Sequence, residues 1–257
     1  MIRRIQAIAR TTFWESIRNK VLYSMLFFAL ALIALSALLG TLAMGDLHKI
    51  IRDVGLAGIH VLTIGISIVA GINLMVQEIN RRSIYVLLAN PLPRWALVVG
   101  KWIGLAALMA VEFAILTVAF FLVLWVANAQ PALPLLLSLA AIYVECLVII
   151  AFAILFSGLA SPVVSSFSVL SLWVIGHLAS DLEGFARKSD STIMRISGEW
   201  LSRIVPNLEV LNFKHTAVHL QPIDLGHFAG AVAYGMGWCV LILAVACLVY
   251  QRKDFAG

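Results

Sequence analysis

The sequence predicts an all-α integral membrane protein with six transmembrane helices. Of its 257 residues, 62% are hydrophobic and only 12% are charged, and the mean hydropathy is +1.02. A soluble domain is closer to half apolar and a quarter charged, so this composition requires lipid as the surrounding solvent. Six apolar segments approach the roughly 20 residues that a helix needs to cross a bilayer. They are about 21–44, 54–76, 102–126, 135–160, 163–180 and 228–250.

The first 20 residues are predicted to form a helix that lies on the membrane surface. Ile2, Ile5, Ala9, Phe13 and Ile17 share one helical face, and arginines occupy the other. A basic helix with aromatic residues is typical of a segment on an anionic leaflet. The apolar run that follows is longer than that of a signal peptide and has no small-residue cleavage site directly after it. We therefore interpret it as a retained first span.

The fourth and fifth predicted spans are separated only by the short segment "ASPVV", in which Pro162 interrupts the helical pattern. Two interpretations follow. The chain forms two separate spans here, which we favour, or it forms one long helix that is broken at the proline.

The distribution of basic residues predicts the orientation. Arginine and lysine concentrate in the N-terminal 20 residues, in 77–101 and in the C-terminal "QRKDFAG", and these segments share one side if there are six spans. Cytoplasmic loops carry the excess of basic residues. We expect a multi-pass protein of the bacterial inner membrane with both termini in the cytoplasm.

The loop 181–227 is then expected to lie outside. Its segment "DSTIMRISGEWLSRI" has the pattern of an amphipathic helix. After Pro206, the apolar residues of "PNLEVLNF" are predicted to pack against the same surface; they are Leu208, Val210, Leu211 and Phe213. We interpret this loop as a cap on the outer end of the bundle. An outer gate, or a docking site for a periplasmic partner, is the alternative.

No pattern typical of an enzyme is present. Gly100 and Lys101 lack the earlier glycine and the following Ser/Thr of a phosphate-binding loop, and HExxH, GxSxG and His/Cys metal clusters are absent. The three cysteines lie in apolar runs without metal-ligand spacing. The basic residues flank apolar runs and form no single patch for nucleic acid. We expect no catalytic residue, no metal or cofactor on this chain, and no nucleic-acid partner.

Few ionisable residues lie inside the predicted spans. Glu112 and Glu145 do, Asn73 lies near the inner end of its span, and His60 and His177 lie nearer the span ends. An intramembrane carboxylate is energetically costly and therefore indicates function. Glu112 and Glu145 are about 14 Å and about 22 Å from the inner ends of their spans, so we expect no shared proton or metal site. Glu112, Glu145 and Asn73 either form structural hydrogen bonds or line a translocation path.

The stretch "QEINRRSIYVLLANPLPRWALVVGKWIG", 77–104, is polar and interrupted by prolines. Its first half has helical periodicity, and Pro91 and Pro93 end the helix. An exposed apolar run such as "IYVLLA" indicates a partner surface. Further along, Gly100 and Gly104 form a GxxxG pair that allows two helices to approach closely, within one chain or between two.

This stretch resembles the loop between the second and third spans of ABC-2 type permeases. The residues that match are Glu78, Arg82, Leu87, Leu88, Pro91, Arg94, Gly100, Lys101 and Gly104. The resemblance extends to the number of spans, the termini, the N-terminal helix and the long outer loop. It implies that the helix at about 78–90 is a coupling helix that docks on a separate ABC ATPase.

Several further expectations rest on this resemblance. Two ATPase chains would bind ATP and Mg²⁺, and a second permease chain, identical or paralogous, would complete a dimer in the lipid. Arg81, Arg82, Tyr85 and Arg94 would contact the ATPase, and Glu78 would lie at the start of the coupling helix. The expected function is the permease subunit of an ATP-driven exporter. A non-transporting scaffold or mechanotransmitter, and an ATP-independent secondary transporter, are the alternatives. The substrate is not indicated.

Overall fold

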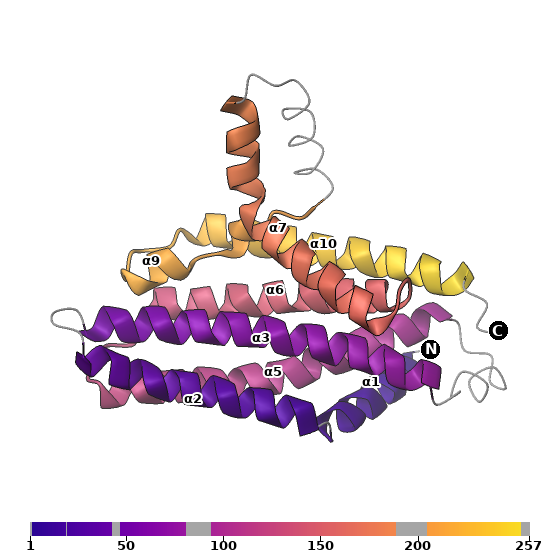
Figure 1. Ribbon diagram of the computed structural model, residues 1–257, viewed down its shortest axis with the longest axis horizontal. Helices are drawn as coiled ribbons and strands as arrows, with labels where there is room; N and C mark the ends of the chain where they lie inside the picture. The colour runs from indigo at the N-terminus through magenta and orange to yellow at the C-terminus, as the bar shows by residue number, and fades with distance from the viewer. Residues whose placement is uncertain (1, 19, 43–46, 81–93, 189–204, 253–257) are drawn as a thin grey trace.

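The computed structural model describes residues 2–18, 20–42, 47–80, 94–188 and 205–252. These ranges form helices and contain no strand, which confirms the predicted all-α class. The helices are α1 (Ile2–Ile17), α2 (Lys20–Leu42), α3 (Leu47–Asn80), α5 (Arg94–Val126), α6 (Leu133–Ser157), α7 (Pro162–Lys188), the short 3₁₀ helix η1 (Leu208–Leu211), α9 (Lys214–Val218) and α10 (Leu225–Arg252) (Figure 1).

Five of these helices contain a segment that is long and apolar enough to cross a membrane, as expected of a multi-pass membrane protein. The segments are Leu47–Leu74, Trp95–Val126, Leu133–Ser157, Pro162–Asp181 and Leu225–Gln251. They overlap the second to sixth predicted spans. Helix α2 covers the predicted first span, and its described apolar part, Tyr23–Leu38, is shorter.

Helix α6 is the most central element of the bundle. Apart from Tyr143, every residue from Ala141 to Leu155 is buried. A helix that is apolar on all sides must be surrounded by other helices or lipid, and α6 contacts α3, α5, α7 and α10. The rest of the bundle is therefore built around α6, and any polar side chain on it must find its partners inside the protein.

The chain reverses direction between α6 and α7. Pro162 begins α7, where its missing N–H is not needed and its fixed φ suits a helix. Ser165 near the start of α7 donates a hydrogen bond to the carbonyl oxygen of Phe156 near the end of α6 (2.9 Å), while Trp173 reaches back to Glu145 (2.7 Å). The two helices are therefore antiparallel neighbours. This arrangement supports the interpretation as two helices and excludes one long helix broken at Pro162.

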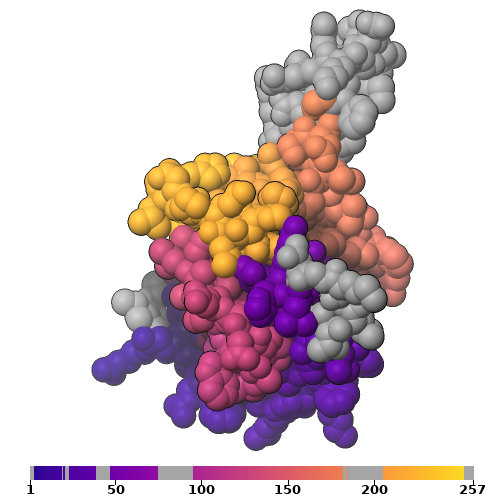
Figure 2. Space-filling view, turned by 90° about the vertical axis from the view of Figure 1, so that its left-hand side faces the viewer, coloured from indigo at the N-terminus to yellow at the C-terminus, as the bar shows by residue number. Residues whose placement is uncertain are grey.

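The start of α1 and the end of α10 lie at the same end of the bundle as the end of α3 and the start of α5, which flank 81–93 (Figure 1). The start of α3 and the short helix α9 lie at the opposite end (Figure 1). Figure 2 faces that opposite end, where the segment containing η1 and α9 packs against α3 and α6. We call 205–218 the cap segment.

The cap segment is anchored by apolar side chains. Leu208 is 1% exposed and belongs to the central core cluster, whereas Leu211 (1% exposed) and Phe213 (6% exposed) belong to a second cluster, against which Val210 packs. The predicted burial of these apolar residues against the bundle is confirmed. The predicted amphipathic helix in "DSTIMRISGEWLSRI" lies outside the described residues.

The GxxxG pair of α5 packs against α1 within the same chain. A Cβ atom at Gly104 would lie 2.6 Å from the carbonyl oxygen of Ala9, and one at Gly100 would lie 2.8 Å from the Ile8 side chain. Both distances are far below van der Waals contact, so only glycine permits this approach. The predicted N-terminal helix is therefore held on α5, and the question of which helices the pair joins is answered.

We predict that Gly104→Ala destabilises the protein although alanine is the better helix former. The added methyl group must displace α1, and overpacking of this kind costs about 1–3 kcal/mol. The measurement is thermal unfolding of the detergent-purified protein, together with the rate at which a protease cleaves α1, which rises if α1 is released from α5. Gly230→Ala on α10 is the matched control, because a Cβ atom there meets nothing within 4 Å. It should be neutral or slightly stabilising, and equal effects of the two changes would contradict the prediction.

Candidate functional site

The predicted coupling residues lie at, or between, the ends of two long helices. Helix α3 runs without interruption from Leu47 to Asn80 and includes Glu78 in its last turn. The prediction that Glu78 begins a separate helix is therefore wrong. No proline or glycine follows Gly71 in α3, so nothing in the sequence ends the helix earlier. Arg94 begins α5. The other coupling residues lie outside the described residues; they are Arg81, Arg82, Tyr85, Leu87, Leu88 and Pro91.

The remaining predicted residues are inside the bundle but do not form one site. Lys101 is buried in α5, between the two glycines that contact α1. Asn73 is half-buried on α3. Glu112 of α5 is only 7% exposed, and its Oε2 atom has no hydrogen-bond partner among the described residues. The structure thus separates Glu112 from the polar contacts of Glu145.

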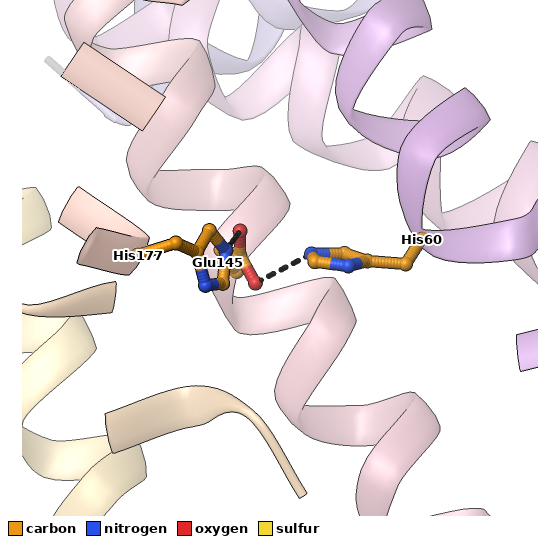
Figure 3. A group of neighbouring side chains, drawn as sticks. All are labelled: His60, Glu145 and His177. Carbon is orange, nitrogen blue, oxygen red and sulfur yellow. Dashed lines mark hydrogen bonds and ion pairs between the residues drawn. The ribbon is translucent and has the colours of Figure 1, made fainter. Parts of the chain in front are cut away.

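Glu145, on α6, is the centre of a buried polar network (Figure 3). The Nε2 atom of His60 on α3 lies 2.8 Å from its Oε2 atom, and the Nε2 atom of His177 on α7 lies 2.9 Å from its Oε1 atom. Trp173 of α7 donates a third hydrogen bond to Oε1 (2.7 Å). The Glu145 side chain is 1% exposed. A buried carboxylate is tolerated only when it is paired and hydrogen-bonded, and three donors from two other helices meet that requirement.

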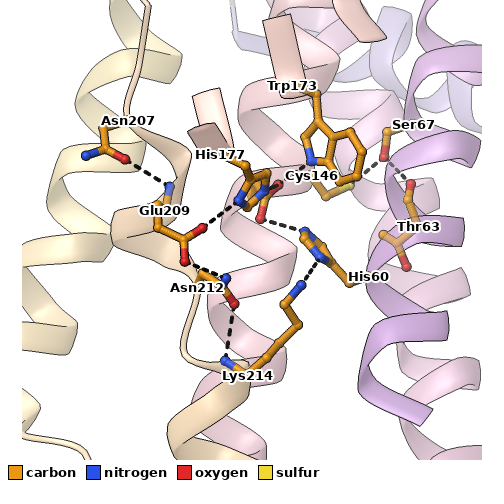
Figure 4. Close-up of polar contacts among 11 residues, drawn as sticks. His60, Thr63, Ser67, Cys146, Trp173, His177, Asn207, Glu209, Asn212 and Lys214 are labelled. Carbon is orange, nitrogen blue, oxygen red and sulfur yellow. Dashed lines mark hydrogen bonds and ion pairs between the residues drawn. The ribbon is translucent and has the colours of Figure 1, made fainter. Parts of the chain in front are cut away.

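A second layer of polar side chains comes from the cap segment (Figure 4). The Oε2 atom of Glu209 lies 2.9 Å from Nδ1 of His177, and Nζ of Lys214 lies 2.7 Å from Nδ1 of His60. Asn212 donates a hydrogen bond from Nδ2 to Oε1 of Glu209 (2.8 Å). Each histidine therefore faces Glu145 with one nitrogen and the cap segment with the other.

The positions of the hydrogens follow from this pattern. Because Lys214 donates to Nδ1 of His60, Nε2 of that ring carries the hydrogen and donates to Glu145. Both nitrogens of His177 face carboxylate oxygens, so both carry hydrogens and the ring is an imidazolium. The positive charges of His177 and Lys214 then balance the negative charges of Glu145 and Glu209. The network is neutral as a whole, which is what a buried set of charges requires.

Lys214 lies in the first turn of α9, outside the predicted spans. Burial lowers the pKa of its ammonium group from the ordinary 10.5, and the nearby carboxylates of Glu145, Glu209 and Asp53 oppose that shift. The contact with His60 gives this partly desolvated ammonium an acceptor inside the protein.

Glu145 and His60 lie at a similar depth although they are far apart in the sequence. Glu145 is the thirteenth residue of α6 and His60 is the fourteenth of α3. At 1.5 Å per residue, each is about 18–20 Å from the start of its helix. This shared depth brings the two residues together once α3 and α6 pack side by side, and α7 adds His177 from its own position against them.

Sequence reasoning missed this network. His60 and Glu145 are separated by 85 positions, so no motif contains both. The predicted orientation could have suggested that these residues meet, because it places His60, Glu145 and His177 in the outer halves of their spans. Trp173, Glu209 and Lys214 carried no comparable signal, because only the packing of α7 and the cap segment places them beside Glu145.

The geometry permits two chemical roles. The network ties the cap segment to three long helices through charged hydrogen bonds. It also offers metal ligands, because one ring nitrogen of each histidine and one carboxylate oxygen lie within 4.8 Å of one another.

The family model described as "ABC-2 family transporter protein" matches residues 40–255 of the chain. The match includes the network, the cap segment and all the long helices from α3 to α10. No curated protein matches the chain.

The two buried glutamates should respond in opposite ways to loss of charge. Glu145→Gln removes the counter-charge of His177 and places an amide N–H₂ against ring N–H groups, so we predict a loss of about 3 kcal/mol or more in unfolding free energy. Glu112→Gln removes a carboxylate with an unpartnered oxygen, and should be neutral or stabilising. Thermal unfolding in detergent measures both. A Glu145→Gln protein as stable as the parent would show that the network contributes little.

Proposed function

Since the chain belongs to the ABC-2 family of transporter proteins, we propose that it is the permease subunit of an ATP-driven ABC exporter. The observation that carries this proposal is the family match over 40–255, nearly the whole chain. The many apolar helices agree with a membrane transport subunit.

We further propose that ATP is hydrolysed on a separate chain. This sequence contains no phosphate-binding loop, so ATP and Mg²⁺ would bind two copies of an ABC ATPase. A second permease chain, identical or paralogous, would face this one in the membrane. With six spans, α2 being the first, both termini and 81–93 would lie in the cytoplasm of a bacterial inner membrane. The start of α1, the end of α10 and the two helix ends that flank 81–93 lie at one end of the bundle, which supports this topology (Figure 1).

The long helices supply a route for coupling. The segment 81–93 connects the end of α3 directly to the start of α5. We propose that it docks on the ATPase and that ATP-driven closure of the ATPase dimer moves both helices. Only a difference in contact between the ATPase states can supply the energy for that movement. Because α3 is unbroken, displacement of its inner end would reach His60 near the other end.

Among the residues that we considered for a translocation path, Glu112 remains the best candidate. Glu145 is already engaged by His60, Trp173 and His177, whereas one carboxylate oxygen of Glu112 has no partner among the described residues. A buried carboxylate inside a span, with an oxygen that no described residue engages, is typical of a functional position.

One observation favours a second candidate function, which is the transmission of force to a periplasmic partner. The cap segment is fastened to α3, α6 and α7 by the buried network, so movement of these helices would also move the cap. A fluorophore attached at Gln221→Cys, an exposed position just beyond the cap segment, would report this movement. ATP-dependent fluorescence changes without transport of any substrate would favour force transmission.

We predict that Arg82→Glu and Arg94→Glu weaken binding to the ABC ATPase roughly tenfold or more. Placing like charges against each other across an interface costs several kcal/mol, and each 1.4 kcal/mol is a factor of ten. The measurement is the amount of ABC ATPase that co-purifies with the chain from membranes, and the ATP turnover of the complex. Arg252→Glu at the end of α10 is the matched control, since it reverses a basic charge on the same side but outside the docking segment. Unchanged co-purification of both variants would contradict the coupling assignment.

A further inference from the structure

We propose that His60, Glu145 and His177 form a binding site for a divalent transition-metal ion of the Zn²⁺ type. This inference concerns the chain itself and does not depend on which substrate, if any, the protein transports.

The donor set is the first argument. Two imidazole nitrogens and one carboxylate oxygen are the ligands that Zn²⁺ and similar ions bind in proteins, whereas Mg²⁺ and Ca²⁺ prefer oxygen ligands alone. The Nε2 atoms of His60 and His177 converge on the two oxygens of Glu145 from opposite helices, and the ligand atoms lie within 4.8 Å of one another. Three protein ligands from α3, α6 and α7 would leave one position of a tetrahedral ion open.

The surroundings of these ligands are the second argument. Metal-bound histidines are normally oriented by a hydrogen bond from the other ring nitrogen to a carboxylate, a carbonyl or water. Here Nδ1 of His177 is held by Glu209, at 2.9 Å, and Nδ1 of His60 contacts Lys214, at 2.7 Å. Trp173 donates a hydrogen bond to Oε1 of Glu145, at 2.7 Å. Each of the three ligands therefore has a further side-chain partner, and for His177 this partner is the carboxylate that metal-bound histidines commonly have.

Charge balance is the third argument. When the ion binds, one proton leaves Nε2 of each histidine for solvent, and Lys214 passes one ammonium proton to Nδ1 of His60 and becomes a neutral amine. A charge of 2+ then replaces two protons, so the network remains neutral in its buried position. Lys214 does not oppose the ion, because it lies on the far side of the imidazole ring. His177, at 17% exposed, is the most accessible ligand, against 2% for His60 and 1% for Glu145.

The test uses the full chain, purified in detergent with an affinity tag free of histidine. Metal is removed with a chelator, Zn²⁺ alone is added, and tightly bound zinc is counted by mass spectrometry after desalting. The expected result is one Zn²⁺ per chain, with Mg²⁺ not retained. Replacing both histidine ligands, in His60→Gln with His177→Gln, should abolish tight binding. Glu209→Gln, which changes only the support of His177, should weaken binding roughly 10- to 100-fold.

The matched control removes a different pair of histidines, His215 in the cap segment and His219 just after it. His215 and His219 have ring centroids 4.6 Å apart, so they could bind zinc adventitiously. The variant His215→Gln with His219→Gln should still bind one Zn²⁺. X-ray absorption of this zinc-loaded variant should show two imidazole ligands, and this readout is valid even if the ligand variants fail to fold. No retained Zn²⁺, retention that depends on His215 and His219, or a spectrum without two imidazoles would each overturn the proposal.

Discussion

The buried carboxylate of Glu145 is the constraint on which the outer half of this structure depends. It lies on α6, the helix with the least access to water or lipid, where an unpaired negative charge is strongly unfavourable. His60, Trp173 and His177 provide its partners, and they arrive on α3 and α7. These helices can contact α6 in only one rotation and at one depth if the hydrogen bonds are to form. One charge therefore determines the register of three helices.

The same requirement extends to the cap segment. His177 and His60 each have a second nitrogen that also needs a partner, and Glu209 and Lys214 supply these partners from outside the predicted spans. The apolar anchors of the cap would tolerate small shifts, because apolar packing has little directional preference. The charged hydrogen bonds are directional and tie the cap to the long helices. In an ABC-2 permease, this arrangement would connect the outer surface to α3, whose other end leads to the proposed docking segment.

Much of the fold could be predicted because a membrane imposes simple rules on a sequence. Long apolar runs between basic segments predicted the all-α class and the positions of α3, α5, α6, α7 and α10. Pro162 predicted the break between α6 and α7. A proline affects only the local backbone, however, so it could not show whether the chain reverses direction there. The GxxxG pair predicted a close helix contact, yet its partner, α1, depends on how helices pack. Glu78 was misplaced because the sequence contains no residue that ends α3 before the polar stretch.

By itself, the sequence determined the environment of this protein, its helices and the resemblance of one loop to a known family, because hydropathy, charge bias and short motifs are local properties. It also identified Glu145 as an unusual residue. Only the tertiary structure decided that two histidines hydrogen-bond to Glu145 and connect it to the cap segment. It also decided that Glu112 is not part of this network. Contacts between residues 85 positions apart depend on the rotation and depth of packed helices, and no local pattern encodes these.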